Sequence, residues 1–192
     1  MAGAIPITFR RMVGGNGANP TIMRLPENNN CVALRGVPIA QTSGYVDESA
    51  TINGNNNLFY GFSAEAGKNR ATDGTAETLV VPGGVQNQNN AHVIPLGAPM
   101  DDGNMGVISA GPNTRFMGAL TSSNNVAAAQ LGATMGLTKD SNNYWYLDPA
   151  KNNQASGGCV VITKLVDPVG TNAGKLEFAV IQARVQFLSQ QT

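Results

Sequence analysis

The sequence predicts an all-β protein, built as an antiparallel barrel or sandwich with an extended N-terminal arm. Short apolar stretches alternate with turn signals along most of the chain. The turns are rich in Gly and in Asn, with 23 and 22 residues among 192, and both residue types tolerate a positive φ. No strand–helix–strand rhythm is present, which disfavours a parallel sheet and the nucleotide-binding folds built on one.

Residues 1–30 differ from the rest and are predicted to form the arm, with the β domain spanning residues 31–192. A short strand is expected at Ile5–Phe9, a flexible glycine-rich stretch at 14–20, and an extended segment at Thr21–Pro26 because of the proline. Such arms often become ordered on a partner. An edge strand followed by a long loop is an equally good interpretation. Six apolar side chains of this segment have no obvious core and are candidate capsid or subunit contacts: Ile5, Ile7, Phe9, Ile22, Met23 and Leu25.

From residue 31 onward, strands and turns alternate. Turns are expected at Arg35-Gly36, at Pro82-Gly83-Gly84 and at Gly111-Pro112-Asn113. An Ala-rich stretch, Asn125–Met135, is the one candidate helix of any length, and Ser63–Lys68 could add a single helical turn. The predicted strands are Cys31–Arg35, Val37–Gln41, Leu58–Phe62, Thr78–Val81, His92–Leu96, Gly106–Ser109, Thr114–Leu120, Tyr144–Leu147, Gly158–Val166 and Lys175–Phe187.

The last of these strands carries a change of phase. Apolar side chains alternate at Leu176, Phe178 and Val180, and the alternation then slips by one residue. Because a one-residue slip turns every later side chain to the other face, the pattern predicts a bulged or sheet-switching strand. Leu176–Val180 should pack in the core. The later apolar residues should face a second sheet or a neighbouring subunit, and they are candidate contacts: Ile181, Val185 and Phe187.

Charge and composition narrow the possible partners. The chain has 12 basic and 12 acidic residues, for a formal net charge of zero. Nucleic acid and anionic membranes are disfavoured as partners because both require clustered Lys and Arg. Low charge also removes a barrier to self-association.

No secretory signal pattern and no transmembrane-length apolar run is visible, so a cytoplasmic product is expected. Cys31 and Cys159 each lie in an apolar run and are predicted to be buried thiols, with a disulfide as the less favoured alternative.

No chemical signature stands out, so neither an enzyme nor a cofactor, metal or small-molecule substrate is expected. His92 is the only histidine and cannot build a histidine-rich metal site. A turn is favoured over a calcium loop at Asp101–Asn104, because the distal glutamate ligand is missing. The glycines at 14–17 lack the lysine of a phosphate loop. The aromatic run Tyr144-Trp145-Tyr146 could bind a sugar. In an alternating strand, however, Trp145 faces one side and both tyrosines the other, which favours core and cross-strand packing.

Several blocks together resemble the decoration, or cement, proteins of tailed-bacteriophage capsids. Each block is a turn-and-strand pattern, and together they span most of residues 31–180. They are Gly36–Ile39, Gly44–Val46, Tyr60–Gly74, Thr114–Leu120, Gly136–Asp140, Tyr144–Asp148, Val166–Thr171 and Leu176–Val180.

The resemblance implies a β-tulip-like or barrel domain, often trimeric, on the outside of the phage head. It also implies an arm that pairs with the major capsid protein, for which residues 1–30 show no matching motif. We therefore expect a non-enzymatic virion protein, assembled in the host cytoplasm, that binds the head lattice and stabilises it. A carbohydrate-binding tail-fibre or spike module, and a tail or collar component, are the alternatives.

Overall fold

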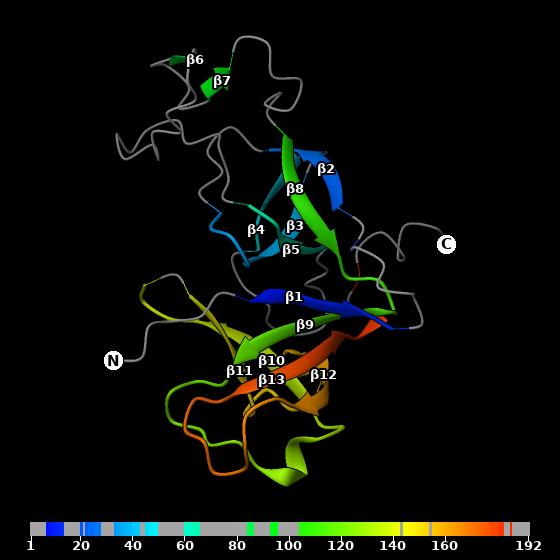
Figure 1. Ribbon diagram of the computed structural model, residues 1–192, viewed down its shortest axis with the longest axis vertical. Coiled ribbons are helices and arrows are strands. Elements are labelled where there is room, and N and C mark those ends of the chain that lie inside the picture. The colour runs from blue at the N-terminus through cyan, green and yellow to red at the C-terminus, as the bar shows by residue number, and fades with distance from the viewer. Residues whose placement is uncertain are drawn as a thin grey trace.

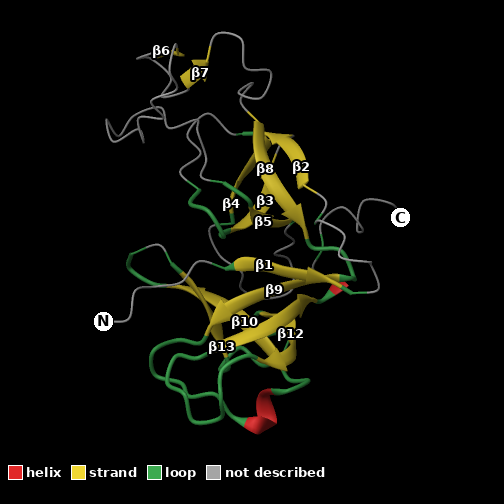
Figure 2. Ribbon diagram, viewed as in Figure 1, coloured by secondary structure: helices red, strands yellow, loops and turns green. Residues whose placement is uncertain are grey.

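The computed structural model describes residues 7–13, 20, 22–27, 33–42, 45–49, 60–65, 84–86, 93–95, 104–142, 144–153, 155–182 and 185. These residues form an all-β, sandwich-like structure, which confirms the predicted fold class (Figures 1 and 2). One 3-10 helix, η1 (Ala128–Gln130), accompanies the strands. The strands are β1 (Thr8–Met12), β2 (Ile22–Pro26), β3 (Pro38–Thr42), β4 (Tyr45–Glu48), β5 (Gly61–Ser63), β6 (Gly84–Gln86), β7 (Val93–Pro95), β8 (Asn104–Ser109), β9 (Thr114–Ala119), β10 (Thr134–Lys139), β11 (Trp145–Asp148), β12 (Gly158–Leu165) and β13 (Lys175–Val180).

Two antiparallel sheets make up the body. Sheet A has the strand order β1-β9-β13-β12-β10-β11, and sheet B has the order β2-β8-β5-β3-β4. β6 and β7 pair separately as a two-stranded ribbon. The curvature of both sheets is shown by bridges between strands that are not neighbours in the sheet order. Leu120 after β9 forms a bridge with Leu147 of β11, and Glu27 after β2 forms one with Val46 of β4.

The core lies between the sheets and is centred on three phenylalanines. Phe62 of β5 comes from sheet B, whereas Phe116 of β9 and Phe178 of β13 are cross-strand partners in sheet A. The Phe62 ring centroid lies 4.6 Å from that of Phe116 and 5.8 Å from that of Phe178. All three side chains are essentially inaccessible to solvent. Burial of aromatic surface at this junction therefore holds one sheet against the other.

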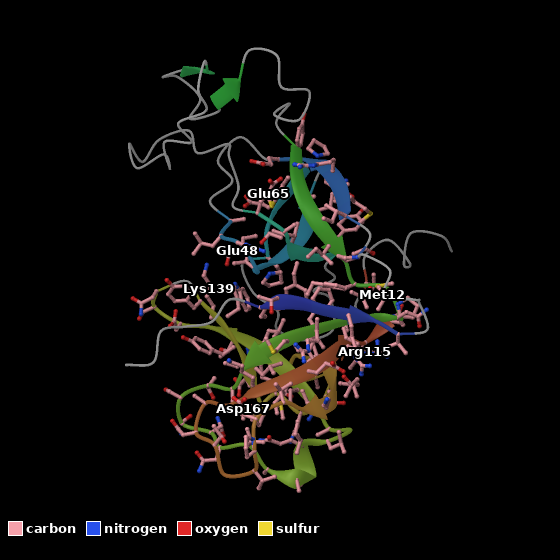
Figure 3. All side chains as sticks on the ribbon, viewed as in Figure 1. Met12, Glu48, Glu65, Arg115, Lys139 and Asp167 are labelled. Carbon is pink, nitrogen blue, oxygen red and sulfur yellow. The ribbon has the colours of Figure 1, made fainter. Side chains whose placement is uncertain are left out.

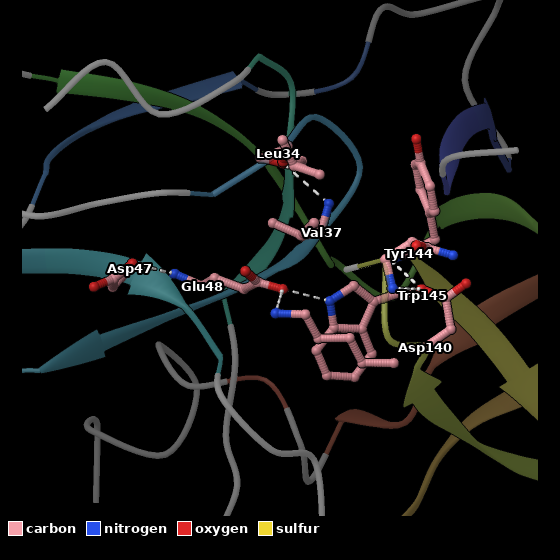
Figure 4. A network of polar contacts seen from close by, with 10 residues as sticks. Leu34, Val37, Asp47, Glu48, Asp140, Tyr144 and Trp145 are labelled. Atoms are coloured by element: carbon pink, nitrogen blue, oxygen red, sulfur yellow. Dashed lines mark hydrogen bonds and ion pairs between the residues drawn. The ribbon is translucent and has the colours of Figure 1, made fainter. Parts of the chain in front are cut away.

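A polar contact joins the sheets at one side of this core (Figures 3 and 4). Trp145 of β11 donates its indole N–H to Glu48 Oε1 of β4 at 2.7 Å. The Lys139 ammonium of β10 lies 2.9 Å from the same oxygen. Trp145 is only 4% exposed whereas Tyr144 is 39% exposed, which agrees with the predicted opposite faces of the aromatic run.

The final strand is shorter than predicted. Leu176, Phe178 and Val180 are buried, as expected, but β13 ends at Val180 and does not reach Phe187. The Ile181 amide still donates to Cys159 O at 2.9 Å, and a turn follows in which the Val185 amide donates to Gln182 O. The phase slip therefore marks the end of the strand rather than a bulge within it.

The described part of the N-terminal segment belongs to the sheets. β1 pairs with β9 at the edge of sheet A, and β2 pairs with β8 at the edge of sheet B. Ile7 is 3% exposed within the core, and Leu25 packs against it. The expectation of no core is therefore wrong for Ile7 and Leu25, and the alternative of edge strands describes β1 and β2.

Other differences arise where local signals are weak. The helix expected at Asn125–Met135 is reduced to the three residues of η1, and β10 begins at Thr134. β4 was not predicted. The described residues of the strand expected at Cys31–Arg35 lead into a turn instead, with Gly36 at φ 80°. Of the turn expected at Ser63–Lys68, Ser63 lies in β5 and residues 66–68 lie outside the described residues.

Candidate functional site

Three of the nine predicted contact residues line one groove between the two sheets. Ile7 and Phe9 reach it from the edge of sheet A, and Ile22 reaches it from β2 of sheet B. Met23 and Leu25 are half-buried along β2. Ile181 is half-buried and Val185 is fully buried in the core, so Val185 is not a surface contact. Ile5 and Phe187 lie outside the described residues.

The groove has a volume of about 320 Å³ and is open to solvent. Its walls come from β1, from the start of β2, from the turn before β3, and from β5 and β8. The lining residues are Ile7, Thr8, Phe9, Pro20, Ile22, Arg35, Ser63, Ala64 and Ile108. Ile22 is 52% exposed, which is unusually high for a large apolar side chain in a strand. The groove is therefore mainly apolar, with an exposed arginine as its one charged member.

The β1 wall is positioned by a buried carboxylate. Arg11 donates to Glu177 through Nε and Nη2, both at 3.0 Å, and Thr163 Oγ1 donates to the same carboxylate at 3.0 Å. The Glu177 side chain is 2% exposed. Burial raises the pKa of Glu177, but hydrogen bonds from Arg11 and Thr163 and the charges of Arg11 and Lys164 together hold that pKa below its usual value. Glu177 therefore stays ionised and ties β1 to the middle of sheet A.

A register shift in β1 helps to direct Phe9 into the groove. Phe9 lies opposite Phe116, whereas Arg11 lies opposite Arg115, and the shift between them falls at Arg10. Because opposite residues of an antiparallel pair share a face, Phe9 lies on the core side with Phe116. Within the described part of the chain, no strand pairs with the outer edge of β1. The groove thus runs beside an open sheet edge.

The sheet B wall is fixed by hydrogen bonds from the turn before β3. The Ser63 hydroxyl donates to Leu34 O at 2.5 Å and accepts from the Val37 amide at 3.1 Å. The Gly36 amide donates to Ser63 O at 3.0 Å. Nearby, Glu65 forms an ion pair with Arg24 and accepts from the Gly106 amide. Most of the polar groups named here already form hydrogen bonds or ion pairs within the protein. The groove therefore suits apolar or extended segments.

Residues of the types that bind metal ions do not cluster in the described ranges. No group of three or more His, Cys, Asp or Glu side chains that could hold a metal ion occurs there. Cys159 is fully buried. His92, Cys31 and residues 101–103 of the turn expected at Asp101–Asn104 lie outside the described residues, so the interpretations given to them stay predictions, and Asn104 begins β8. No helix among the described residues is long and apolar enough to cross a bilayer.

A second, smaller hollow of about 190 Å³ lies beside the β10–β11 hairpin. Each of its lining residues carries a polar group: Thr121, Ser122, Thr138, Lys139, Asp140 and Tyr146. Tyr146 donates to Asp140 Oδ2 at 3.2 Å, while Asp140 Oδ1 accepts from two backbone amides of the turn. Burial and the neighbouring Asp140 charge raise the pKa of Tyr146, so its phenol stays protonated.

The sequence did not identify Arg35, Ser63, Ala64 and Ile108 as members of the groove. They lie far apart in the chain and meet only because β5 and β8 pair beside the edge of sheet A. The local signal was the apolar side chains of Ile7, Phe9 and Ile22, for which the sequence showed no obvious core. No protein-family model matches the chain, and no curated protein matches it either.

Proposed function

We propose that this chain is a non-enzymatic structural protein of a tailed-bacteriophage particle that binds the outside of the head and stabilises the capsid lattice. The groove beside β1 carries the proposal, because it joins an exposed apolar surface to a strand edge with which no described strand pairs. An extended segment of a partner can add to such an edge through main-chain hydrogen bonds while its side chains enter the groove. The resemblance to capsid decoration proteins supplies the kind of partner, the major capsid protein.

The physical character of the surface supports the proposal. With only 12% charged residues and no net charge, contacts made by this chain depend mainly on apolar burial and amide hydrogen bonds. Such contacts vary little with salt concentration. Many copies on a lattice would add strength by avidity even where each contact is weak. This is how a protein without catalysis could reinforce a shell.

We expect Ile22→Asp to weaken binding to heads that lack this protein by at least about tenfold, because a carboxylate would have to be desolvated in the groove. Ile22 is 52% exposed, so the fold should be preserved. Binding is measured by co-sedimentation over a range of protein concentrations. Tyr45→Asp is the matched control, since Tyr45 is also 52% exposed and lies outside the groove lining.

Equal binding by the wild type and Ile22→Asp would reject the groove as the contact. A point substitution tests the groove more directly than deletion of residues 1–25. The deletion would also remove β1 and most of β2 from the two sheets. Imaging of labelled protein on intact particles then separates a head location from a tail or collar location.

The polar hollow beside the β10–β11 hairpin favours a second candidate function, binding of a neutral carbohydrate. Several hydroxyls, a fixed carboxylate and a tyrosine ring match the mixed donors, acceptors and apolar faces of a sugar. We expect any glycan-array signal to fall with Tyr146→Phe and to persist with Tyr144→Phe, which alters an exposed ring next to the hollow. An array without signals would remove this function.

A further inference from the structure

Two loops of sheet A form one end of the molecule, which we call the two-loop tip: residues 121–133 and 168–174. The first loop follows β9 and contains η1, and the second precedes β13 (Figures 1 and 2). They are far apart in the sequence but lie side by side, joined by a bridge between Asn125 and Asn172. The tip is distinct from the groove, none of whose lining residues belongs to it.

Hydrogen bonds between the loops hold the tip in one conformation. The Val126 amide donates to Thr171 O at 2.9 Å, and the Gly170 amide donates to Val126 O at 2.8 Å. The Asn172 side-chain amide donates to Ser122 O at 2.9 Å and to Asn125 Oδ1 at 3.0 Å. The Val126 side chain is 1% exposed and anchors the pair of loops to the core. A surface ordered in this way loses little conformational entropy when it binds.

The tip is also uncharged, and it exposes apolar side chains. Neither loop contains Asp, Glu, Lys, Arg or His. Val169 is 63% exposed and Leu131 is 58% exposed, the two highest values among the large apolar side chains that the structure describes. Ala128 and Ala129 are exposed beside them in η1. Depletion of charged residues is one compositional signal of interface cores, and here it is combined with two exposed large apolar side chains.

We propose that the two-loop tip is the surface through which copies of this chain associate with one another. In a closed symmetric oligomer, equivalent surfaces from each subunit meet around the axis. A charged surface would place like charges together there, whereas this surface has none. Its Asn and Gln side chains both donate and accept hydrogen bonds, so they can pair with their own copies. The absence of net charge on the whole chain favours the same association.

This proposal rests on the proposed role as a structural protein of an assembly and names a contact between its copies. The two can fail separately, because self-association is measured on purified protein without phage heads. Sedimentation equilibrium of the full chain should show an oligomer, and the double variant Leu131→Asp with Val169→Asp should weaken association by at least about tenfold through like-charge repulsion. Tyr45→Asp, an equally drastic change on β4, should leave association unchanged.

A wild-type chain that stays monomeric up to about 100 μM would overturn the proposal, since that limit is far above the roughly micromolar range of specific contacts. An oligomer that the double variant leaves intact would overturn it too. A photo-crosslinking residue in place of Leu131 gives a reading that does not depend on the charged variants. Crosslinks to the tip of another copy support the proposal, and their absence in an oligomeric sample contradicts it.

Discussion

Replacing Phe62 with alanine is expected to lower the free energy of unfolding by about 3–5 kcal/mol. Phe62 is the contribution of sheet B to the three-phenylalanine cluster, and its ring meets Phe116 and Phe178 of sheet A. Truncation removes apolar burial and leaves a cavity between two sheets that are each fixed by their own hydrogen bonds. Because the sheets cannot close the gap without breaking those bonds, the cost should lie at the high end for core substitutions.

The measurement is urea-induced unfolding followed by the fluorescence of Trp145, the only tryptophan, which lies at the junction of the sheets. Tyr45→Ala is the control, because Tyr45 is 52% exposed and its loss should change stability by less than about 0.5 kcal/mol. A loss below about 1 kcal/mol for Phe62→Ala would show that the phenylalanine cluster does not hold the sheets together.

The strands predicted best are those with apolar patterns and nearby turn signals. The first half of Lys175–Phe187 shows period-2 alternation, which reports a half-buried strand directly, whereas β12 begins with the continuous apolar run Cys159–Ile162. The alternation could not distinguish a bulge from the end of a strand, since both shift the phase by one residue. Val185 is buried in the core, and its amide donates to Gln182 O. This burial depends on tertiary packing, which the alternation does not report.

β10 was missed for a tertiary reason. Its residues Met135, Gly136 and Leu137 are all buried, so the strand shows no polar and apolar alternation. Gly136 allows a close approach, because a Cβ atom there would lie 2.5 Å from Lys151 Cβ. The Ala-rich residues before it favour a helix locally, yet the backbone at Val126 is hydrogen-bonded to the loop before β13. Long-range pairing outweighed the local propensity.

The groove and the tip could not be predicted from sequence for a related reason. Ile7, Phe9 and Ile22 were chosen because no core was visible for them, and Ile7 proves to be a core residue whose strand also forms a wall of the groove. The tip combines two loops, 121–133 and 168–174, that carry no motif. Each surface exists only once distant segments pair, so composition could indicate an interaction protein but not its surfaces.

Glu177→Gln is expected to destabilise the protein by about 1.5–3 kcal/mol at pH 7, because it replaces charge-assisted hydrogen bonds by neutral ones at a site 2% exposed. The effect should depend on pH in a defined direction. The folded-state pKa of Glu177 lies below its usual value, so the unfolded chain takes up the proton at a higher pH than the folded chain. The carboxylate therefore contributes fully above about pH 4.3, the usual value for an unfolded glutamate, and its contribution is lost as the pH falls through the lower folded pKa.

Urea unfolding at pH 7, 5, 4 and 3 tests this. The difference in the free energy of unfolding between the wild type and Glu177→Gln should be constant above about pH 5 and should shrink below about pH 4. Arg11→Gln should be much less harmful in the Glu177→Gln background than in the wild type, since both changes break the same contact. Because Arg11 is the link between β1 and Glu177, both variants should also speed hydrogen exchange in β1 while leaving β12 protected. Equal destabilisation at pH 3 and pH 7, with independent effects of the two substitutions, would mean that this ion pair does not hold the wall of the groove.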